Sequence, residues 1–215
     1  MVGLEAESQS RVVTDTQREY EFLERYIDSG KPAYPAGEHH YLIKTPFRYD
    51  TPTPPQHSAR FKPPEGNPKA FYASMEPTTT FYEVAYHWLY ERLHLPSSTQ
   101  TPEPRTLFSV SFTDPQAFDL KKDPNWEAIS GKAGYQASWE FVRAHPDTDS
   151  IWYPSCRAPD GTNLFTRNIK TLGRDPNEQV QFSLVLRKKE KACYLFSTIQ
   201  DLRWPSLLIR WDEVA

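Results

Sequence analysis

Residues 58–88, SARFKPPEGNPKAFYASMEPTTTFYEVAYHW, contain the signals that decide the fold. Residues 69–74 are rich in aromatic side chains and are bounded on both sides by turn-forming prolines, which predicts a β-strand. Residues 78–93 then carry apolar side chains at the spacing of one buried helix face, which predicts an α-helix. Because the end of a strand and the start of the next helix are close in space, polar side chains at this junction can line a cleft.

Three polar side chains stand out in this stretch. Arg60 lies in the proline-rich loop, Tyr72 in the middle of the strand and Glu83 near the start of the helix. Each also has a structural interpretation. Glu83 follows Thr80 by three residues, the spacing of a capping box at a helix start. Tyr72 can be a core ring whose hydroxyl is satisfied, and Arg60 a solvated loop charge.

A second stretch, residues 150–165 (SIWYPSCRAPDGTNLF), reads as a buried strand that releases into a polar loop containing glycine. Ser155 stands where this strand ends. Because loops at strand ends hold binding groups on a rigid base, Ser155 is a candidate site residue. The alternative is a turn serine that hydrogen-bonds its own backbone.

Together these stretches resemble the RES domain, a family named for arginine, glutamate and serine. The likeness runs from about Tyr41 to the C-terminal strands, and the block YPS-R-P-GTN is its most specific part. The resemblance implies a fold like that of the ADP-ribosyltransferases. It also implies a bacterial toxin that degrades NAD, encoded beside an antitoxin of the Xre helix-turn-helix type.

The resemblance also implies the site residues. Glu83 and Arg60 would be catalytic, and four further residues would bind substrate: Arg48, Tyr49, Tyr72 and Ser155. Arg48 and Tyr49, in TPFRYD, resemble the upstream arginine-tyrosine pair of the family. The sequence departs from the family around Arg60, where SARFKPP stands in place of the usual GGRW.

Length and composition bound the fold. With 215 residues the chain is long enough for one domain with a substantial core. We expect an N-terminal helical extension at residues 1–40 and a RES-like domain at residues 41–215. A net charge of −3 and an isoelectric point of about 6.1 disfavour nucleic acid as the main partner. The 20 prolines and 30 aromatic residues favour long ordered loops packed by rings.

Sequence patterns in the N-terminal half of the chain predict further helices and strands. Residues 14–29 form an amphipathic pattern that predicts a helix, docked either on the domain or on a partner, and we favour packing on the domain. Residues 41–44 are predicted as the first strand, and residues 45–68 as a long proline-rich loop with a functional role. Residues 105–112 alternate as a strand does, with a hairpin to residues 117–120.

The C-terminal half predicts helices at residues 126–129 and 135–144. Strands are expected at residues 180–187, 192–197 and 206–211, with a charged turn after the first of them. Helices and strands are interspersed without regular βαβ units, so we expect an α+β fold and not a doubly wound sheet. The resemblance to the RES family further implies a split β-sheet core with peripheral helices. No Rossmann or Walker glycine motif is present, so NAD would not be held in Rossmann fashion.

Cys156 and Cys193 form no disulfide framework, and no cysteine or histidine cluster has the spacing of a metal site. These features, with the absence of an apolar leader or membrane span, predict a cytoplasmic protein.

The reaction expected for NAD+ is cleavage of the nicotinamide–ribose bond, with NAD+ as substrate and not as a resident cofactor. Glu83 would stabilise the positive charge that develops on the sugar. The acceptor stays open. Phosphate would make the protein a phosphorylase, water a glycohydrolase and a macromolecule an ADP-ribosyltransferase. A non-enzymatic interaction module is the remaining alternative, and homodimer formation also stays open.

Overall fold

The structure is a computed structural model, and it describes residues 2–6, 14–49, 59–65, 69–93, 102–197 and 206–215. Much of the proline-rich loop, residues 50–58 and 66–68, therefore lies outside the described residues. The helices are α1 (Gln17–Ser29), α2 (Tyr41–Lys44), α3 (Pro77–Leu93), α4 (Trp126–Ser130), α5 (Gln136–Ala144) and α6 (Trp211–Val214). The strands are β1 (Val2–Ala6), β2 (Phe71–Ser74), β3 (Glu103–Ser109), β4 (Phe118–Asp119), β5 (Ser150–Pro154), β6 (Thr162–Thr166), β7 (Glu178–Arg187), β8 (Ala192–Ser197) and β9 (Leu207–Arg210).

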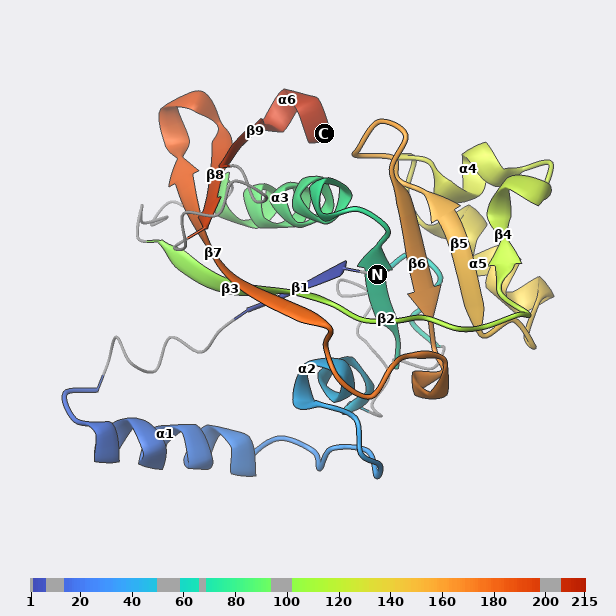
Figure 1. Cartoon of the computed structure of the whole chain (residues 1–215). Helices are drawn as coiled ribbons and strands as arrows, with labels where there is room; N and C mark the ends of the chain where they lie inside the picture. Colours follow the sequence, from blue (N-terminus) through green and yellow to red (C-terminus); the bar gives the residue numbers. More distant parts are fainter. Residues whose placement is uncertain (1, 7–13, 50–58, 66–68, 94–101, 198–205) are drawn as a thin grey trace.

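The described strands form one sheet in the order β4-β5-β6-β2-β1-β3-β7-β8-β9. Neighbours pair antiparallel except β4 and β5, which run parallel. Two well-paired halves meet in the middle, where β1 joins β2 through the single residue pair Val2 and Ser74. Helices and strands mix without βαβ repetition, which confirms the α+β class (Figure 1).

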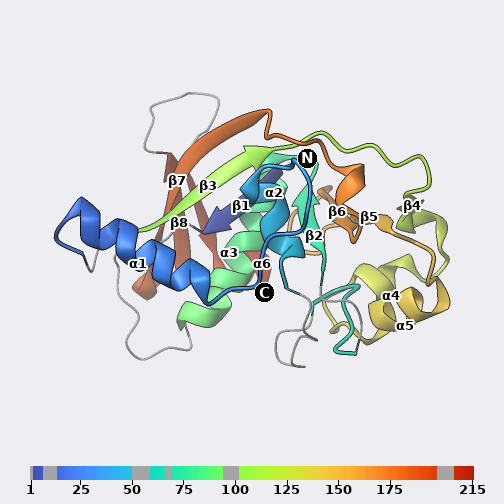
Figure 2. The same ribbon diagram turned by 90° about the horizontal axis from the view of Figure 1, so that it is seen from below.

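The register shows which side chains share a face of the sheet. Ser74 and Ser109 both pair with Val2, so Tyr72 and Leu107, two residues earlier, project from one face. Phe108 projects from the opposite face. α3 covers the first face, whereas α1 and α2 lie on the other side of the sheet, as Figures 1 and 2 show. The site residues on α3 are thus separated from α1 and α2 by the sheet.

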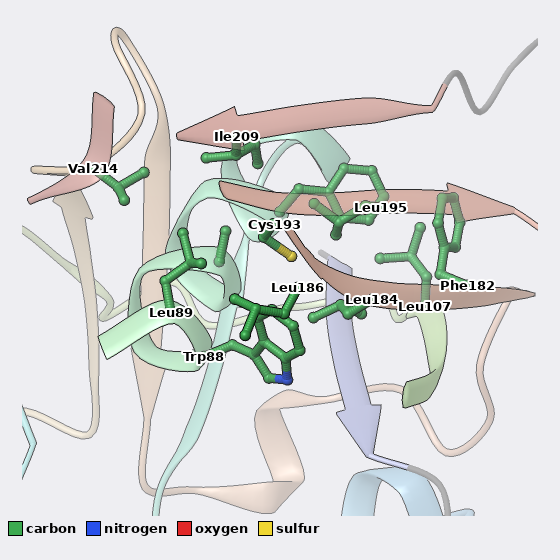
Figure 3. Close-up of a cluster of buried hydrophobic side chains, with 12 residues drawn as sticks. Trp88, Leu89, Leu107, Phe182, Leu184, Leu186, Cys193, Leu195, Ile209 and Val214 are labelled. Carbon is green, nitrogen blue, oxygen red and sulfur yellow. The ribbon is translucent and has the colours of Figure 1, made fainter. Parts of the chain in front are cut away.

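The described residues form three clusters of buried apolar side chains. The largest packs α3 against β3, β7, β8 and β9, with Trp88 and Leu89 facing Leu184 and Leu195 (Figure 3). A second, around Phe61, Phe165 and Phe141 of α5, lies over β5 and β6. The third joins α2 to the far face of the sheet. Because the first two clusters lie on the same face of the sheet, α3 and the α4–α5 pair both pack on that face.

Several sequence predictions are confirmed. α3 begins at Pro77 and buries Phe81, Ala85, Trp88 and Leu89, as the apolar spacing indicated. The helices at α4 and α5 and the strands at β2, β3, β5, β7, β8 and β9 also lie where expected, within a few residues.

Other predictions are wrong. Residues 41–44 form the helix α2 and not a strand, because His40 accepts the Leu42 N–H and caps a short helical turn. A four-residue apolar run has too few residues for its period to distinguish the two structures. β4 pairs parallel with β5, so the predicted hairpin with the 105–112 strand does not form.

The N-terminal region also differs from expectation. α1 has a capping box from Thr16 and Glu19, but it buries none of its residues, so it is not packed on the domain as expected. Residues 2–6 are a strand in the middle of the sheet and not part of a helical extension. The boundary between residues 40 and 41 stays a prediction.

Candidate functional site

The carboxylate of Glu83 is the centre of a cluster of polar side chains on the face of the sheet that α3 covers. Its Oε1 accepts hydrogen bonds from Ser155 Oγ at 2.7 Å and from Asn163 Nδ2 at 2.6 Å. Glu83 comes from the second turn of α3, Ser155 from the end of β5 and Asn163 from β6. Side chains far apart in the sequence therefore converge on one carboxylate oxygen.

The capping-box interpretation of Glu83 is wrong. α3 begins at Pro77, so Thr80 already lies in the first turn, and its N–H donates to the carbonyl of Glu76. Glu76 serves the helix start, because its Oε2 accepts from Thr79 Oγ1 at 2.8 Å. Glu83 is free of any cap role and faces the sheet.

Ser155 makes hydrogen bonds both to Glu83 and to the backbone of the β5–β6 loop. Its Oγ accepts from the backbone N–H groups of Arg157 at 3.0 Å and of Ala158 at 2.9 Å, while its hydroxyl proton goes to Glu83. The serine is thus a turn residue and a partner of the carboxylate at once. Gly161 closes the same loop so near α3 that an added Cβ would lie 2.6 Å from Thr79 Oγ1.

Asn163 was missed as a site residue by the sequence analysis, although it stands in the GTN block that carries the family resemblance. The strand β6 that places it was read as loop. Its side chain is 2% exposed, and its Oδ1 accepts from Ser74 Oγ at 2.7 Å. The signal that could have found it is the alternation Asn163 and Phe165, which puts both on one face of a strand.

Arg60 lies on the same face and is 9% exposed. Its guanidinium donates to the carbonyls of Ile129 at 2.7 Å and Gly131 at 2.9 Å, and approaches Cys156 Sγ at 3.5 Å. It also lies over the ring of Tyr135, 5.4 Å from the ring centroid. Arg60 therefore satisfies the C-terminal carbonyls of α4 while keeping its positive charge beside the loop that follows β5.

Tyr72 has the contacts of a core residue. Its hydroxyl donates to the backbone carbonyl of Arg60, and its ring packs against Phe165 with centroids 5.4 Å apart. Burial raises the pKa of Tyr72, so the phenol stays protonated at ordinary pH. Burial, followed by the charge of Glu83, likewise raises the pKa of Tyr153 well above its usual value. Of these two neutral phenols, Tyr153 is the one that interacts with the charge of Glu83.

Arg48 and Tyr49 are not brought to this cluster. Arg48 is 5% exposed and donates to Asp28 Oδ1 at 2.6 Å and to the backbone carbonyl of Pro32, and it stacks on Tyr34 at 4.2 Å. The hydrogen bond from Arg48 lowers the pKa of Asp28. Phe47, the residue before Arg48, packs with α2 on the face of the sheet opposite Glu83. In this structure Arg48 tethers α1.

Arg157 was also missed. It lies 3.5 Å over the ring of Tyr86, donates to the Val214 carbonyl at 2.6 Å, and Tyr86 stacks on Trp211 with centroids 5.5 Å apart. Tyr86 follows Glu83 by one turn of α3, so this stack borders the carboxylate. The C-terminal helix α6, which lies above α3 in Figure 1, therefore contacts both Arg157 and Tyr86.

An open hollow of about 380 Å³ lies beside the cluster. It is lined by Glu76, Trp152, Tyr153, Thr162 and neighbours, but not by Glu83, Ser155 or Arg60. The hollow and the hydrogen-bonded cluster around Glu83 are therefore separate features of the described residues. Within the described ranges, no three histidine, cysteine or acidic side chains gather as metal ligands would. In the same ranges, no helix has the length and apolar character of a membrane span.

A family model described as the RES domain matches residues 32–186, which is more than half of the chain. The chain belongs to the RES domain family. The RES match includes β2, α3, β5 and β6, and with them Arg60, Tyr72, Glu83, Ser155 and Asn163. A comparison with curated proteins gave no match. RES membership makes this a toxin-like domain related to NAD chemistry in general terms.

Proposed function

We propose that the protein cleaves the nicotinamide–ribose bond of NAD+ and passes the ADP-ribosyl group to phosphate or to water. The observation that carries the proposal is the Glu83 carboxylate with Oε1 fixed by two donors, Ser155 and Asn163. Among the described residues, Oε2 has no hydrogen-bond partner. A carboxylate held in this way can face a sugar cation without rearranging, which is how preorganised charges lower a barrier.

The chemistry follows from that placement. The bond between C1′ and the nicotinamide nitrogen breaks, its electron pair leaves with nicotinamide, and positive charge develops on the ribose. Glu83 stabilises this oxocarbenium-like state more than it stabilises bound NAD+, which raises the rate of the bond cleavage. An oxygen of phosphate or water then bonds to C1′, and when water attacks, its proton passes to the Glu83 carboxylate and from there to solvent.

The remaining side chains have supporting roles in the proposal. Ser155 and Asn163 orient Glu83. The pyrophosphate of NAD+ requires a positively charged partner. Arg60 lies on the face that carries Glu83, whereas Arg48 does not, so we assign this role to Arg60. We assign the place beside the ribose to the neutral phenol of Tyr153, which interacts with Glu83. Tyr72 supports the site through its hydrogen bond to the backbone carbonyl of Arg60.

The biological role we propose is that of a cytoplasmic toxin restrained by an antitoxin of the Xre helix-turn-helix type. RES membership supports this role, and a small DNA-binding protein encoded next to the chain is the expected partner. Co-expression with that protein should abolish NAD loss, whereas the chain alone should deplete NAD in cells.

The test is product analysis with purified protein. Wild type and Glu83→Gln are incubated with NAD+, with and without phosphate, and the products are separated by chromatography. We expect free nicotinamide with a phosphorylated ADP-ribose if phosphate is the acceptor, or with ADP-ribose if water is. Glu83→Gln should fall at least about 10²-fold in kcat because the amide carries no charge.

Three outcomes would count against the proposal. No nicotinamide release at high protein concentration favours a non-enzymatic module. Transfer of radiolabel from NAD+ to a macromolecule favours an ADP-ribosyltransferase. Unchanged turnover in folded Glu83→Gln removes the carboxylate from the mechanism.

A further inference from the structure

The orientation of the Asn163 amide follows from hydrogen-bond chemistry. A carboxylate can only accept, so the group of Asn163 that lies 2.6 Å from Glu83 Oε1 must be its NH2. The amide oxygen then faces Ser74, whose hydroxyl donates to it at 2.7 Å. Hydrogen bonds are therefore donated in one direction, from Ser74 to Asn163 and from Asn163 to Glu83.

The pairing of strands in the sheet fixes the positions of the first two residues in this series of hydrogen bonds. Ser74 and Asn163 are directly opposite each other in the pairing of β2 with β6. They are 3% and 2% exposed, so water cannot substitute for either partner. An amide buried to this degree is stabilised only while its donors and acceptors are satisfied, which leaves Asn163 one favourable arrangement.

The consequence concerns the carboxylate. Glu83 has three rotatable bonds and projects from a helix, so α3 by itself does not fix the plane of its carboxylate. Ser155 Oγ holds Oε1 from the end of β5, and a single donor still permits rotation about that contact. A second donor at the same oxygen, from β6, restricts the rotation and directs Oε2 away from both strands.

We propose that Asn163 is a positioning residue for Glu83 and that Ser74 holds Asn163 in place. Together the two side chains set the orientation in which the Glu83 carboxylate faces the ribose. The inference rests on the proposed NAD cleavage for its kinetic consequence. The effect of Asn163 on the orientation of the Glu83 carboxylate does not depend on which reaction the protein catalyses. Asn163 touches Glu83 and not the substrate, so its removal should reduce turnover and leave NAD+ binding nearly unchanged.

The kinetic experiment compares three variants with wild type in the NAD+ assay. Asn163→Ala should lower kcat about 10- to 100-fold, the usual loss when a residue that orients a reacting group is removed. KM should change by less than about threefold, since the lost interaction acts in the transition state. Ser74→Ala, which only removes the hydroxyl behind the amide, should lower kcat by a smaller factor in the same direction.

Ser150→Ala is the matched control. Ser150 Oγ donates to Thr166 Oγ1 at 3.0 Å, and this buried bond joins β5 to β6 away from Glu83. The variant therefore loses one buried hydrogen bond of the neighbouring strand pair, and kcat should stay within about twofold of wild type. If Asn163→Ala and Ser74→Ala behave like Ser150→Ala, or raise KM without lowering kcat, the inference is overturned.

A crystal structure of Asn163→Ala separates this inference from the proposed function. We expect the Glu83 carboxylate to rotate away from its wild-type plane or to occupy two rotamers. A carboxylate that keeps its plane and its contact with Ser155 overturns the positioning role, whatever the NAD+ assay shows. Inactive wild-type protein together with a rotated carboxylate would instead reject the proposed reaction and retain the structural role.

Discussion

At the scale of single residues, Arg60 shows how one side chain can serve the fold and the site together. Its guanidinium replaces water at the two carbonyls that end α4, and its backbone carbonyl accepts the hydroxyl of Tyr72. The same charge remains within reach of Cys156, next to Ser155. An effect on activity alone therefore cannot define its role, and stability must be measured as well.

Arg60→Met tests how much Arg60 contributes to the stability of the fold. The change keeps a long apolar stem but leaves the buried carbonyls of Ile129 and Gly131 without a charged donor, so the free energy of unfolding should fall by about 2–4 kcal/mol. The measurement is urea denaturation. Arg143→Met is the control, because water screens the exposed ion pair of Arg143 with Glu65 and its loss should leave the stability nearly unchanged. Equal losses in the two variants would contradict the anchoring role of Arg60.

At the scale of elements, the site depends on how closely the β5–β6 loop approaches α3. Gly161 makes this approach possible, because Thr79 Oγ1 and Cγ2 would lie 2.6 and 2.7 Å from a Cβ at that position. The loop carries Ser155 and leads into Asn163. A small displacement of the loop from the helix should therefore disturb both donors to Glu83.

Gly161→Ala should lower the free energy of unfolding by about 1–3 kcal/mol, the usual cost of an overpacked contact, and reduce NAD+ turnover. Combining it with Thr79→Ala removes both clashing atoms. The double variant should therefore lose less free energy of unfolding than the sum of the losses in the two single variants. Thermal and urea unfolding measure the stabilities. Gly30→Ala is the control, because its Cβ would meet nothing closer than 3.6 Å. Strictly additive losses would show that this contact does not set the loop position.

At the scale of the whole molecule, the two halves of the sheet carry different parts of the site. The half with β5 and β6 supplies Ser155 and Asn163, whereas α3, which carries Glu83, packs mainly on the half with β3, β7 and β8. Strands β8 and β9 and helix α6 lie beyond the matched residues 32–186, yet they supply Leu195, Ile209 and Val214 to that core. The geometry of the site therefore requires both halves to be folded together.

A single cooperative unfolding transition is the expected result. Leu195→Ala, in the core under α3, and Phe165→Leu, in the core under α5, should each destabilise the protein by roughly 1–5 kcal/mol and shift the same transition. Differential scanning calorimetry, together with tryptophan fluorescence, measures this. Two separate transitions, each moved by only one of the variants, would show that the halves fold independently.

Local patterns in the sequence by themselves determined α3, β2, β5 and the C-terminal strands, because apolar period and flanking prolines are properties of neighbouring residues. They also singled out Arg60, Tyr72, Glu83 and Ser155, through their places at strand ends and in the RES-like blocks. Short runs were less informative. Residues 41–44 fold as α2, and β6 was read as loop because its polar Thr162 and Asn163 obscure the alternation.

Only the tertiary structure decided which of these side chains meet. Asn163 reaches Glu83 through the register of β2 with β6, and Arg157 reaches Tyr86 under the C-terminal helix, contacts between residues far apart in the chain. Arg48 goes to Asp28 on the opposite face of the sheet, although its sequence context resembles that of a site residue. The physical reason is that strand pairing and helix packing, which bury apolar surface, fix the face on which each polar group lies.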